Sequence, residues 1–127
     1  MNLLDTHALV WAINEPQRLS LLARRTVESG DFVVSCASLW EMIGKKGRST
    51  SALQDPLAWW RLYVPRAGIK VLSIEPTHVE HLDVLPGPNW DPFDRMIISQ
   101  CIVNGLRLVT KDSLIRGHYQ GHVNCVW

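Results

Sequence analysis

Short apolar runs alternate along the chain with longer segments whose apolar residues recur at helical spacing. The runs predict buried strands at residues 2–4, 32–34, 69–74 and 106–109, and an edge strand at 123–127. The helical spacing predicts helices over residues 7–13, 19–29, 38–46, 55–66, 75–82 and 91–104. Polar or Gly/Pro-rich segments at 47–54 and 86–88 predict loops, and a short turn is expected after residue 112. Strands alternating with helices are typical of an α/β fold, so we expect one domain, residues 1–127, with a mainly parallel sheet of four to five strands flanked by helices.

The predicted helix at 91–104 has the clearest boundaries. Asp91 before Pro92 is a strong helix start, because the carboxylate can accept from free backbone N–H groups and Pro needs no donor there. Asn104-Gly105 supplies the end. The apolar residues expected to face the core are Ile97, Ile98, Cys101 and Ile102 here, Leu21, Leu22 and Ala23 in the second helix, and Leu39, Met42 and Ile43 in the third. Asp94 lies in line with the apolar stripe of its helix, so we expect a positive group near it.

Acidic residues stand near the carboxyl ends of the predicted strands. Asp5 and Asp112 come just after the first and fourth strands. The helix after the second strand carries Glu41, and the helix before the fourth carries Asp91 and Asp94. Because the carboxyl ends of parallel strands meet at one edge of a sheet, we expect these acids to converge there.

Carboxylates gathered in one pocket repel one another and have raised pKa values unless a cation neutralises them. Oxygen ligands alone suit Mg²⁺ or Mn²⁺ rather than Zn²⁺. A carboxylate-held metal lowers the pKa of a bound water and stabilises charge on phosphate oxygens, which favours phosphodiester hydrolysis without a side-chain nucleophile.

Each acid also has a plain structural explanation. Asp91 fits a helix cap, and Asp94 can complete a pair like a capping box with it. Ser38 and Glu41 form a capping-box pattern of their own. Asp112 can be a turn residue after its strand. Asp5, directly after a buried strand, has few local structural roles. Because each acid alone is weak evidence, the hypothesis of a metal site rests on the joint placement of all of them.

Two further groups of residues suggest surfaces. Lys45, Lys46, Arg48 and Arg95 can hold a phosphate backbone beside an acidic metal site, although cations at a helix end also complement its dipole. The helix at 55–66 carries more apolar residues than one face needs, namely Leu57, Trp59, Trp60, Leu62 and Tyr63. We therefore consider a dimer or partner interface at Trp59, Trp60 and Tyr63, with deep burial as the alternative.

The composition is that of an ordinary globular domain. The 127 residues are 46% hydrophobic and 20% charged with a net charge of +1, so global charge neither supports nor excludes a nucleic-acid partner. No apolar run is long enough for a membrane span, no signal peptide is seen, and the three cysteines are odd in number, so we expect a cytoplasmic protein with reduced thiols. The pairs His78/His81 and His118/His122 have spacings that could hold a metal, but no H-E-x-x-H is present and surface or capping roles are expected for them. No G-x-S-x-G, P-loop or G-x-G-x-x-G is present.

Four segments follow one another in an informative order. They are LLDTHALVW at 3–11, SCASLWEM at 35–42, DPFDRMII at 91–98 and LVTKD at 108–112, and the chain ends in Val126-Trp127. With this order and spacing the chain resembles PIN-domain ribonucleases, specifically the VapC-type toxins of bacterial type II toxin–antitoxin pairs. The resemblance covers nearly the whole chain. Asn89-Trp90 departs from the His and basic residue that commonly precede the third motif.

The resemblance implies a catalytic Mg²⁺ or Mn²⁺ site formed by Asp5, Glu41, Asp94 and Asp112, with Asp91 as an extra acid. It implies that Thr6 and Thr110 orient these ligands. It also implies endonucleolytic cleavage of RNA of the tRNA or rRNA class, homodimerisation, and inhibition by a VapB-type antitoxin whose C-terminal segment fills a groove.

Two alternatives stay open on the residues alone. A receiver-like signalling domain has a similar length and an acid after its first strand, but Ser35 stands where its phosphate-accepting Asp would be. A catalytically silent PIN-like binding module would keep the fold only to hold a partner. Cleavage assays with and without metal separate the silent module from a nuclease.

Overall fold

The computed structural model describes residues 1–48, 53–87 and 91–127. In these ranges five strands form a single sheet in the order β3-β2-β1-β4-β5, and all neighbouring pairs are parallel. The strands are β1 (Asn2–Leu4), β2 (Phe32–Ser35), β3 (Lys70–Leu72), β4 (Arg107–Val109) and β5 (Cys125–Val126). The predicted parallel α/β sheet is confirmed, and β5 lies at its edge as expected. Of the loop predictions, residues 49–52 and 88 lie outside the described residues.

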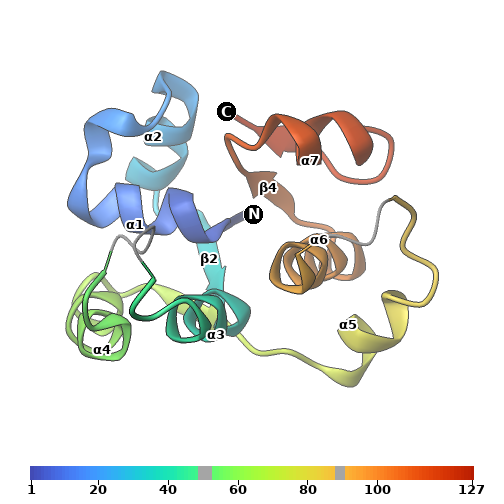
Figure 1. Cartoon of the computed structure of the whole chain (residues 1–127). Helices are drawn as coiled ribbons and strands as arrows, with labels where there is room; N and C mark the ends of the chain where they lie inside the picture. Colours follow the sequence, from blue (N-terminus) through green and yellow to red (C-terminus); the bar gives the residue numbers. More distant parts are fainter. Residues whose placement is uncertain (49–52, 88–90) are drawn as a thin grey trace.

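The described residues also form seven α-helices and one short 3₁₀ helix. These are α1 (Thr6–Asn14), η1 (Pro16–Arg18), α2 (Leu21–Glu28), α3 (Cys36–Gly44), α4 (Pro56–Arg66), α5 (Pro76–His81), α6 (Pro92–Asn104) and α7 (Ser113–His118). Figure 1 shows α1, α2 and α4 on one side of the strands and α5, α6 and α7 on the other. Within the described ranges, no helix combines the length and apolarity that crossing a membrane requires.

Alternation along the strands builds a core on each face of the sheet. Leu3 packs with its strand neighbours Val33 and Leu108 on the face covered by α6 and α7. The next residue, Leu4, packs with its neighbours on the face covered by α1, α2 and α4. Successive side chains in a strand point to opposite faces of the sheet. Consecutive apolar residues such as Leu3 and Leu4 therefore predict a sheet that is covered on both faces.

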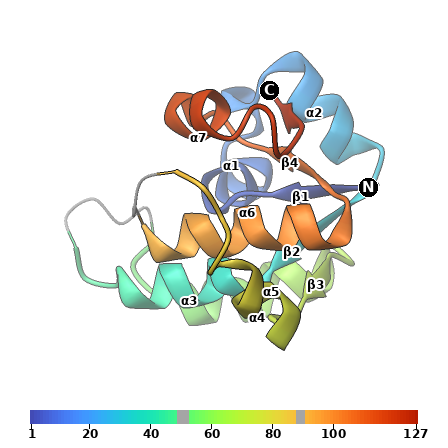
Figure 2. The ribbon, with the colours of Figure 1, turned by 90° about the vertical axis from the view of Figure 1, so that its right-hand side faces the viewer.

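The boundaries of α6 agree with the sequence prediction. Asp91 caps its first turn, and Gly105 ends it in the left-handed conformation with φ of 64°. The predicted buried face is confirmed for Ile97, Ile98 and Cys101, which are each at most 1% exposed. Figure 2 shows α6 beside α3, with the start of α6 next to the end of α3. This arrangement brings two of the acid-bearing helices together.

Two local predictions, on the second helix and on the segment after Asp112, are corrected. Leu21 and Leu22 are 65% and 53% exposed, because the residues that pack into the core are instead Leu19, Ala23 and the partly buried Val27, which are spaced four residues apart. The segment after Asp112, expected to be a turn, forms α7, which buries Ile115. It is stabilised by this packing rather than by a strong local pattern.

The third helix begins earlier than predicted. Ser35 caps α3 by accepting from the N–H of Ala37, so Ser38 lies inside the helix and the Ser38 capping box is wrong. The buried residues of α3 are Ala37, Ser38, Glu41 and Met42, so Glu41 is 4% exposed, whereas Ile43 lies outside this stripe and is 44% exposed.

The tryptophans of α4 belong to the core. Trp59 and Trp60 are each 8% exposed and pack with the cluster on the α1 side of the sheet. The Nε1–H of Trp59 donates to Asn14 Oδ1 at 3.0 Å, which fixes α4 against the end of α1. The deep-burial alternative therefore describes these two residues, and the interface prediction is corrected for them. Tyr63 remains 40% exposed.

Candidate active site

Asp5 and Asp112 follow two paired strands and are linked by one threonine. β1 and β4 are neighbours, and the N–H of Asp5 donates to the carbonyl of Val109 at 3.0 Å. The side chain of Thr110, which is fully buried, hydrogen-bonds to Asp5 and accepts from the N–H of Asp112 at 3.1 Å. Thr110 thus contacts the side chain of Asp5 and the main chain of Asp112.

Thr6 and Glu41 are joined across two helices. The hydroxyl of Thr6 donates to Glu41 Oε1 at 2.6 Å and lies 3.0 Å from Ser38 Oγ. All three side chains are buried. Because a buried carboxylate needs hydrogen-bond partners, this contact from α1 fixes the position of Glu41 on α3.

Lys45 is a positive group among these acids, but it contacts Glu41 and Asp91 rather than Asp94, the residue for which the sequence predicts a positive neighbour. Its ammonium donates to Glu41 Oε2 and lies 3.3 Å from Asp91 Oδ2. Burial disfavours the charged form of Lys45, but its hydrogen bond to Glu41 and the charges of both acids outweigh this and raise its pKa. Lys45 therefore binds the acids themselves, which is a different position from the RNA-backbone contact expected for it.

Asp91 uses its two oxygens differently. Oδ1 accepts from the N–H groups of Phe93 at 2.8 Å and Asp94 at 3.3 Å, which caps α6. Oδ2 faces Lys45. The helix-cap explanation and the site explanation of Asp91 are thus compatible.

Three acids come close enough to share one cation. Glu41, Asp91 and Asp94 each offer an oxygen, and these oxygens all lie within 4.8 Å of one another. A donor set made of carboxylate oxygens fits the hard cations Mg²⁺ and Mn²⁺. Asp5 and Asp112 are outside this group of three, yet both influence it.

The electrostatics of Asp94 show how closely the acids converge. Burial raises its pKa to about 7, and the charges of the four other predicted acids act in the same direction, in the order Asp91, Glu41, Asp5 and Asp112. Burial also raises the pKa of Asp5, opposed mainly by its hydrogen bond to Thr110. A bound cation would relieve this crowding, because it stabilises the ionised carboxylates.

The other predicted cations lie in different settings. Arg95 donates to Tyr119 Oη and to the carbonyls of Leu82 and Leu85, each at 3.4 Å, so it points into the protein and holds the segment before α6. These contacts differ from the RNA-backbone contact expected for Arg95, which stays a prediction. Lys46 and Arg48 are exposed just past the end of α3, and their contact with RNA stays a prediction.

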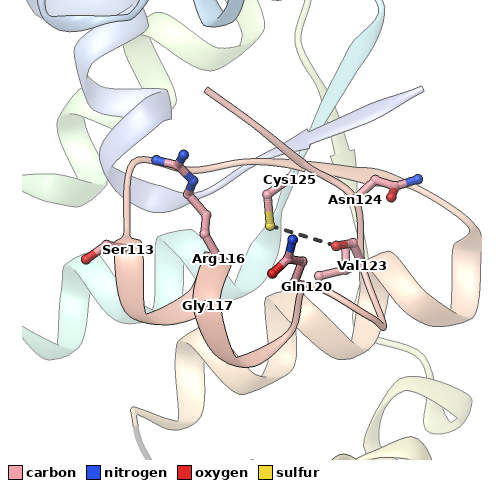
Figure 3. A pocket seen from close by; sticks show the side chains of 7 residues that line it. All are labelled: Ser113, Arg116, Gly117, Gln120, Val123, Asn124 and Cys125. Atoms are coloured by element: carbon pink, nitrogen blue, oxygen red, sulfur yellow. Dashed lines mark hydrogen bonds between the residues drawn. The ribbon is translucent and has the colours of Figure 1, made fainter.

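Two pockets lie along α7. One, of about 390 Å³, is lined by Asp5 and Asp112 and by residues that include His7, Trp11 and Lys111. The other, of about 530 Å³, lies between α7 and β5, where Arg116, Gln120 and Cys125 line it (Figure 3). The sequence prediction missed both pockets because it expected no helix after Asp112.

Replacing Lys45 by Met should weaken the metal-free protein and strengthen its response to metal. Two carboxylates lose their ammonium partner, which should cost about 1–2 kcal/mol, less than for a fully buried pair because the Lys45 side chain is 34% exposed. Mn²⁺ should then raise the melting temperature more than it does in the wild type. Thermal melts with and without Mn²⁺ measure both effects.

The control for this change is Lys46→Met, which removes the neighbouring exposed ammonium from the same helix end. It should leave both the melting temperature and the Mn²⁺ response near the wild-type values. An equal Mn²⁺ response in the Lys45 variant and the wild type would contradict a site centred on the acids that Lys45 binds.

Comparison with known proteins points to one family. The family model of the PIN domain matches residues 3–117. Ribonuclease VapC22 of Mycobacterium tuberculosis is 33% identical over 127 residues, an alignment that covers 98% of this chain and 97% of that protein.

Solved structures share the fold at lower identity. A toxin–antitoxin complex from Klebsiella pneumoniae matches with a TM-score of 0.65 and 18% identity, covering 100% of this chain and 97% of that one. VapBC2 from Rickettsia felis bound to a promoter DNA fragment matches with a TM-score of 0.64 and 16% identity, covering 98% and 96%. DNA-bound VapBC from Salmonella typhimurium matches with a TM-score of 0.63 and 20% identity, covering 98% and 97%.

Proposed function

Because the chain belongs to the PIN-domain family, we propose that it is a metal-dependent endoribonuclease and the toxin of a type II toxin–antitoxin pair. The observation that carries this proposal is the convergence of five acids, three of which offer oxygens within 4.8 Å of one another. The 33% identity to a VapC ribonuclease along nearly the full length of both proteins supports it.

The acids of the site have different proposed roles. Glu41, Asp91 and Asp94 would hold Mg²⁺ or Mn²⁺, with Asp5 and Asp112 on the side of the 390 Å³ pocket. When bound, the metal supplies a water of lowered pKa and stabilises charge on the phosphate oxygens.

Two threonines position these acids. Thr6 keeps Glu41 in place through its hydrogen bond from α1, and Thr110 does the same for Asp5. Their hydrogen bonds limit the freedom of the carboxylates before any substrate arrives, which is the usual function of residues that support a metal site.

Partners are proposed on the same basis. We propose that the substrate is RNA of the tRNA or rRNA class, that the protein acts in the cytoplasm as a homodimer, and that a VapB-type antitoxin inhibits it. Structural neighbours described as VapBC or toxin–antitoxin complexes support such a partner. Leu57, Leu62 and Tyr63 are 36–41% exposed on α4, which supplies apolar surface for a protein contact.

The test is RNA cleavage by the purified, antitoxin-free protein in Mg²⁺, in Mn²⁺ and in EDTA. We expect cleavage that requires either metal and stops in EDTA. A folded protein that binds metal but cuts no RNA under any of these conditions would favour the silent binding module instead. Metal-independent cleavage would contradict the role proposed for the acids.

A further inference from the structure

The pocket beside Asp5 and Asp112 contains more than acids. His7 and Trp11 lie one helical turn apart on α1, and their ring centroids are 5.7 Å apart with the rings tilted by 43°. Both rings line the pocket, and His7 is exposed. We call the space lined by Asp5, His7, Trp11, Lys111, Asp112, Ser113 and Leu114 the His7 pocket. An exposed ring beside phosphodiester chemistry is a surface on which a base can stack.

Trp11 gives the His7 ring a rigid support. It is partly buried and packs against the apolar core together with Trp127, whose ring centroid is 5.9 Å away. The guanidinium of Arg18 lies 4.5 Å from the Trp11 ring centroid, which adds a cation–π contact. Trp11 is therefore fixed by contacts on several sides, and the neighbouring His7 ring is the more exposed of the two.

Lys111 brings a positive charge to the same pocket. Its ammonium lies 5.7 Å from the Trp11 ring centroid, and the side chain is exposed. It directly precedes Asp112, and both residues line the pocket together with His7 and Trp11. A phosphate held by this ammonium would be adjacent to a base on His7 and to the acidic site.

We propose that the His7 pocket binds the nucleotide next to the cut bond, with its base stacked on His7 and its phosphate held by Lys111. This inference rests on the proposed ribonuclease function and adds a positioning surface to it. The volume of about 390 Å³ lies within the range of roughly 300–1,000 Å³ typical of small-molecule pockets. Stacking accepts any base, so the pocket would contribute affinity and register rather than strict sequence choice.

The second pocket along α7 lacks this combination. Its lining offers Arg116 and polar side chains but no aromatic ring and no carboxylate among the residues that the structure describes (Figure 3). The observations therefore favour the His7 pocket as the place where a base is held beside the acids.

The experiment is a double-mutant cycle between protein and RNA. The cut site of a short single-stranded RNA is first mapped with the wild type. Two further versions of this RNA are then made, each with one abasic ribose, on one side of that site or on the other. Cleavage efficiency, kcat/KM, is measured for each RNA with the wild type, His7→Ala and His7→Phe. In EDTA, where cleavage is stopped, fluorescence anisotropy measures binding of the labelled RNAs.

Loss of one flanking base should cost the wild type about tenfold in kcat/KM, as expected for a lost stacking contact. His7→Ala should cost a similar factor with the intact RNA and should show almost no further loss with the abasic RNA. His7→Phe keeps a ring and should retain most of the activity. Lys111→Ala should weaken binding of the intact and the abasic RNAs alike and reduce the salt dependence of binding.

The matched control for His7 is His122→Ala, which also removes an exposed ring that contacts an aromatic neighbour, Tyr119, at 6.5 Å. Lys70→Ala, on the exposed side of β3, is the control for Lys111. Both should behave like the wild type, and thermal melts check that every variant is folded.

The inference is overturned if His7→Ala cleaves RNA but loses as much from the abasic change as the wild type does. Absence of cleavage by the wild type would instead defeat the proposed function, and the anisotropy measurement would still decide on the pocket. Equal affinity of the wild type and His7→Ala for intact RNA in EDTA would then exclude stacking on His7.

Discussion

Replacing Asp94 by Asn should lower metal-dependent RNA cleavage by at least about 100-fold while leaving the fold intact. Asn keeps the size of the side chain but loses the charge that a hard cation requires. Even residues that only support metal ligands cost roughly 10–100-fold when changed, so loss of a ligand itself should exceed that range. The measurement is kcat/KM in saturating Mn²⁺, beside a titration of Mn²⁺ affinity.

The same change should stabilise the metal-free protein. Burial and the four neighbouring acids raise the pKa of Asp94 to about 7, which means that its ionised form is unfavourable in the folded state. Removing that charge should increase the free energy of unfolding by about 1–3 kcal/mol at neutral pH. Opposite effects on activity and stability distinguish a site residue from a helix cap, whose loss would destabilise the protein.

Asp83→Asn provides the control, because Asp83 is exposed near the end of α5 and outside the acidic site. It should change neither cleavage nor stability appreciably. If Asp94→Asn lowered stability and kept cleavage, Asp94 would have a purely structural function.

Metal affinity should depend steeply on pH. Because ligands must be deprotonated before they bind a cation, the proton on Asp94 competes with the metal below its pKa of about 7. The apparent affinity for Mn²⁺ should therefore rise about tenfold per pH unit between about pH 5 and pH 7 and level off above that range. Calorimetric titrations with Mn²⁺ across this range measure the slope.

Stability without metal should change in the opposite direction. A carboxyl whose pKa is raised from 3.8 to about 7 binds its proton more tightly in the folded state. Its contribution to stability is fully present below the unfolded pKa and is lost as the pH rises through about 7. Asp94→Asn should flatten both profiles, and a Mn²⁺ affinity that is constant from pH 5 to pH 7 would exclude Asp94 as a titrating ligand.

Local signals explain why some elements could be predicted from the sequence. The start of α6 is determined by Asp91 and Pro92, and its end by Gly105, all within the helix or next to it. The strands were recognisable as short apolar runs, and their parallel order followed from the helices between them. The convergence of the acids then followed from the sheet itself, since Asp5 and Asp112 come after the ends of paired strands.

Features that depend on distant contacts could not be predicted in this way. Lys45 lies among the acids only because the end of α3 meets the start of α6, 46 residues further along the chain. α7 carries Gly117 in a six-residue helix, and the burial of Ile115 and Tyr119 stabilises what local propensity does not. The outward direction of Leu22 depends on the packing of Leu19, Ala23 and Val27 into the core, which the periodic pattern alone left open.

Three of the acids also begin helices, since Asp5, Asp91 and Asp112 each accept backbone N–H groups of the helix that follows. Their carboxylates are therefore positioned by the main chain, which is the part of a protein that side-chain replacement changes least. The arrangement of these acids should survive extensive drift in the surrounding core, provided that the helices still begin at the same residues. Insertions or deletions at the ends of the strands would be far more damaging than substitutions within them, because they would move the helix starts away from one another.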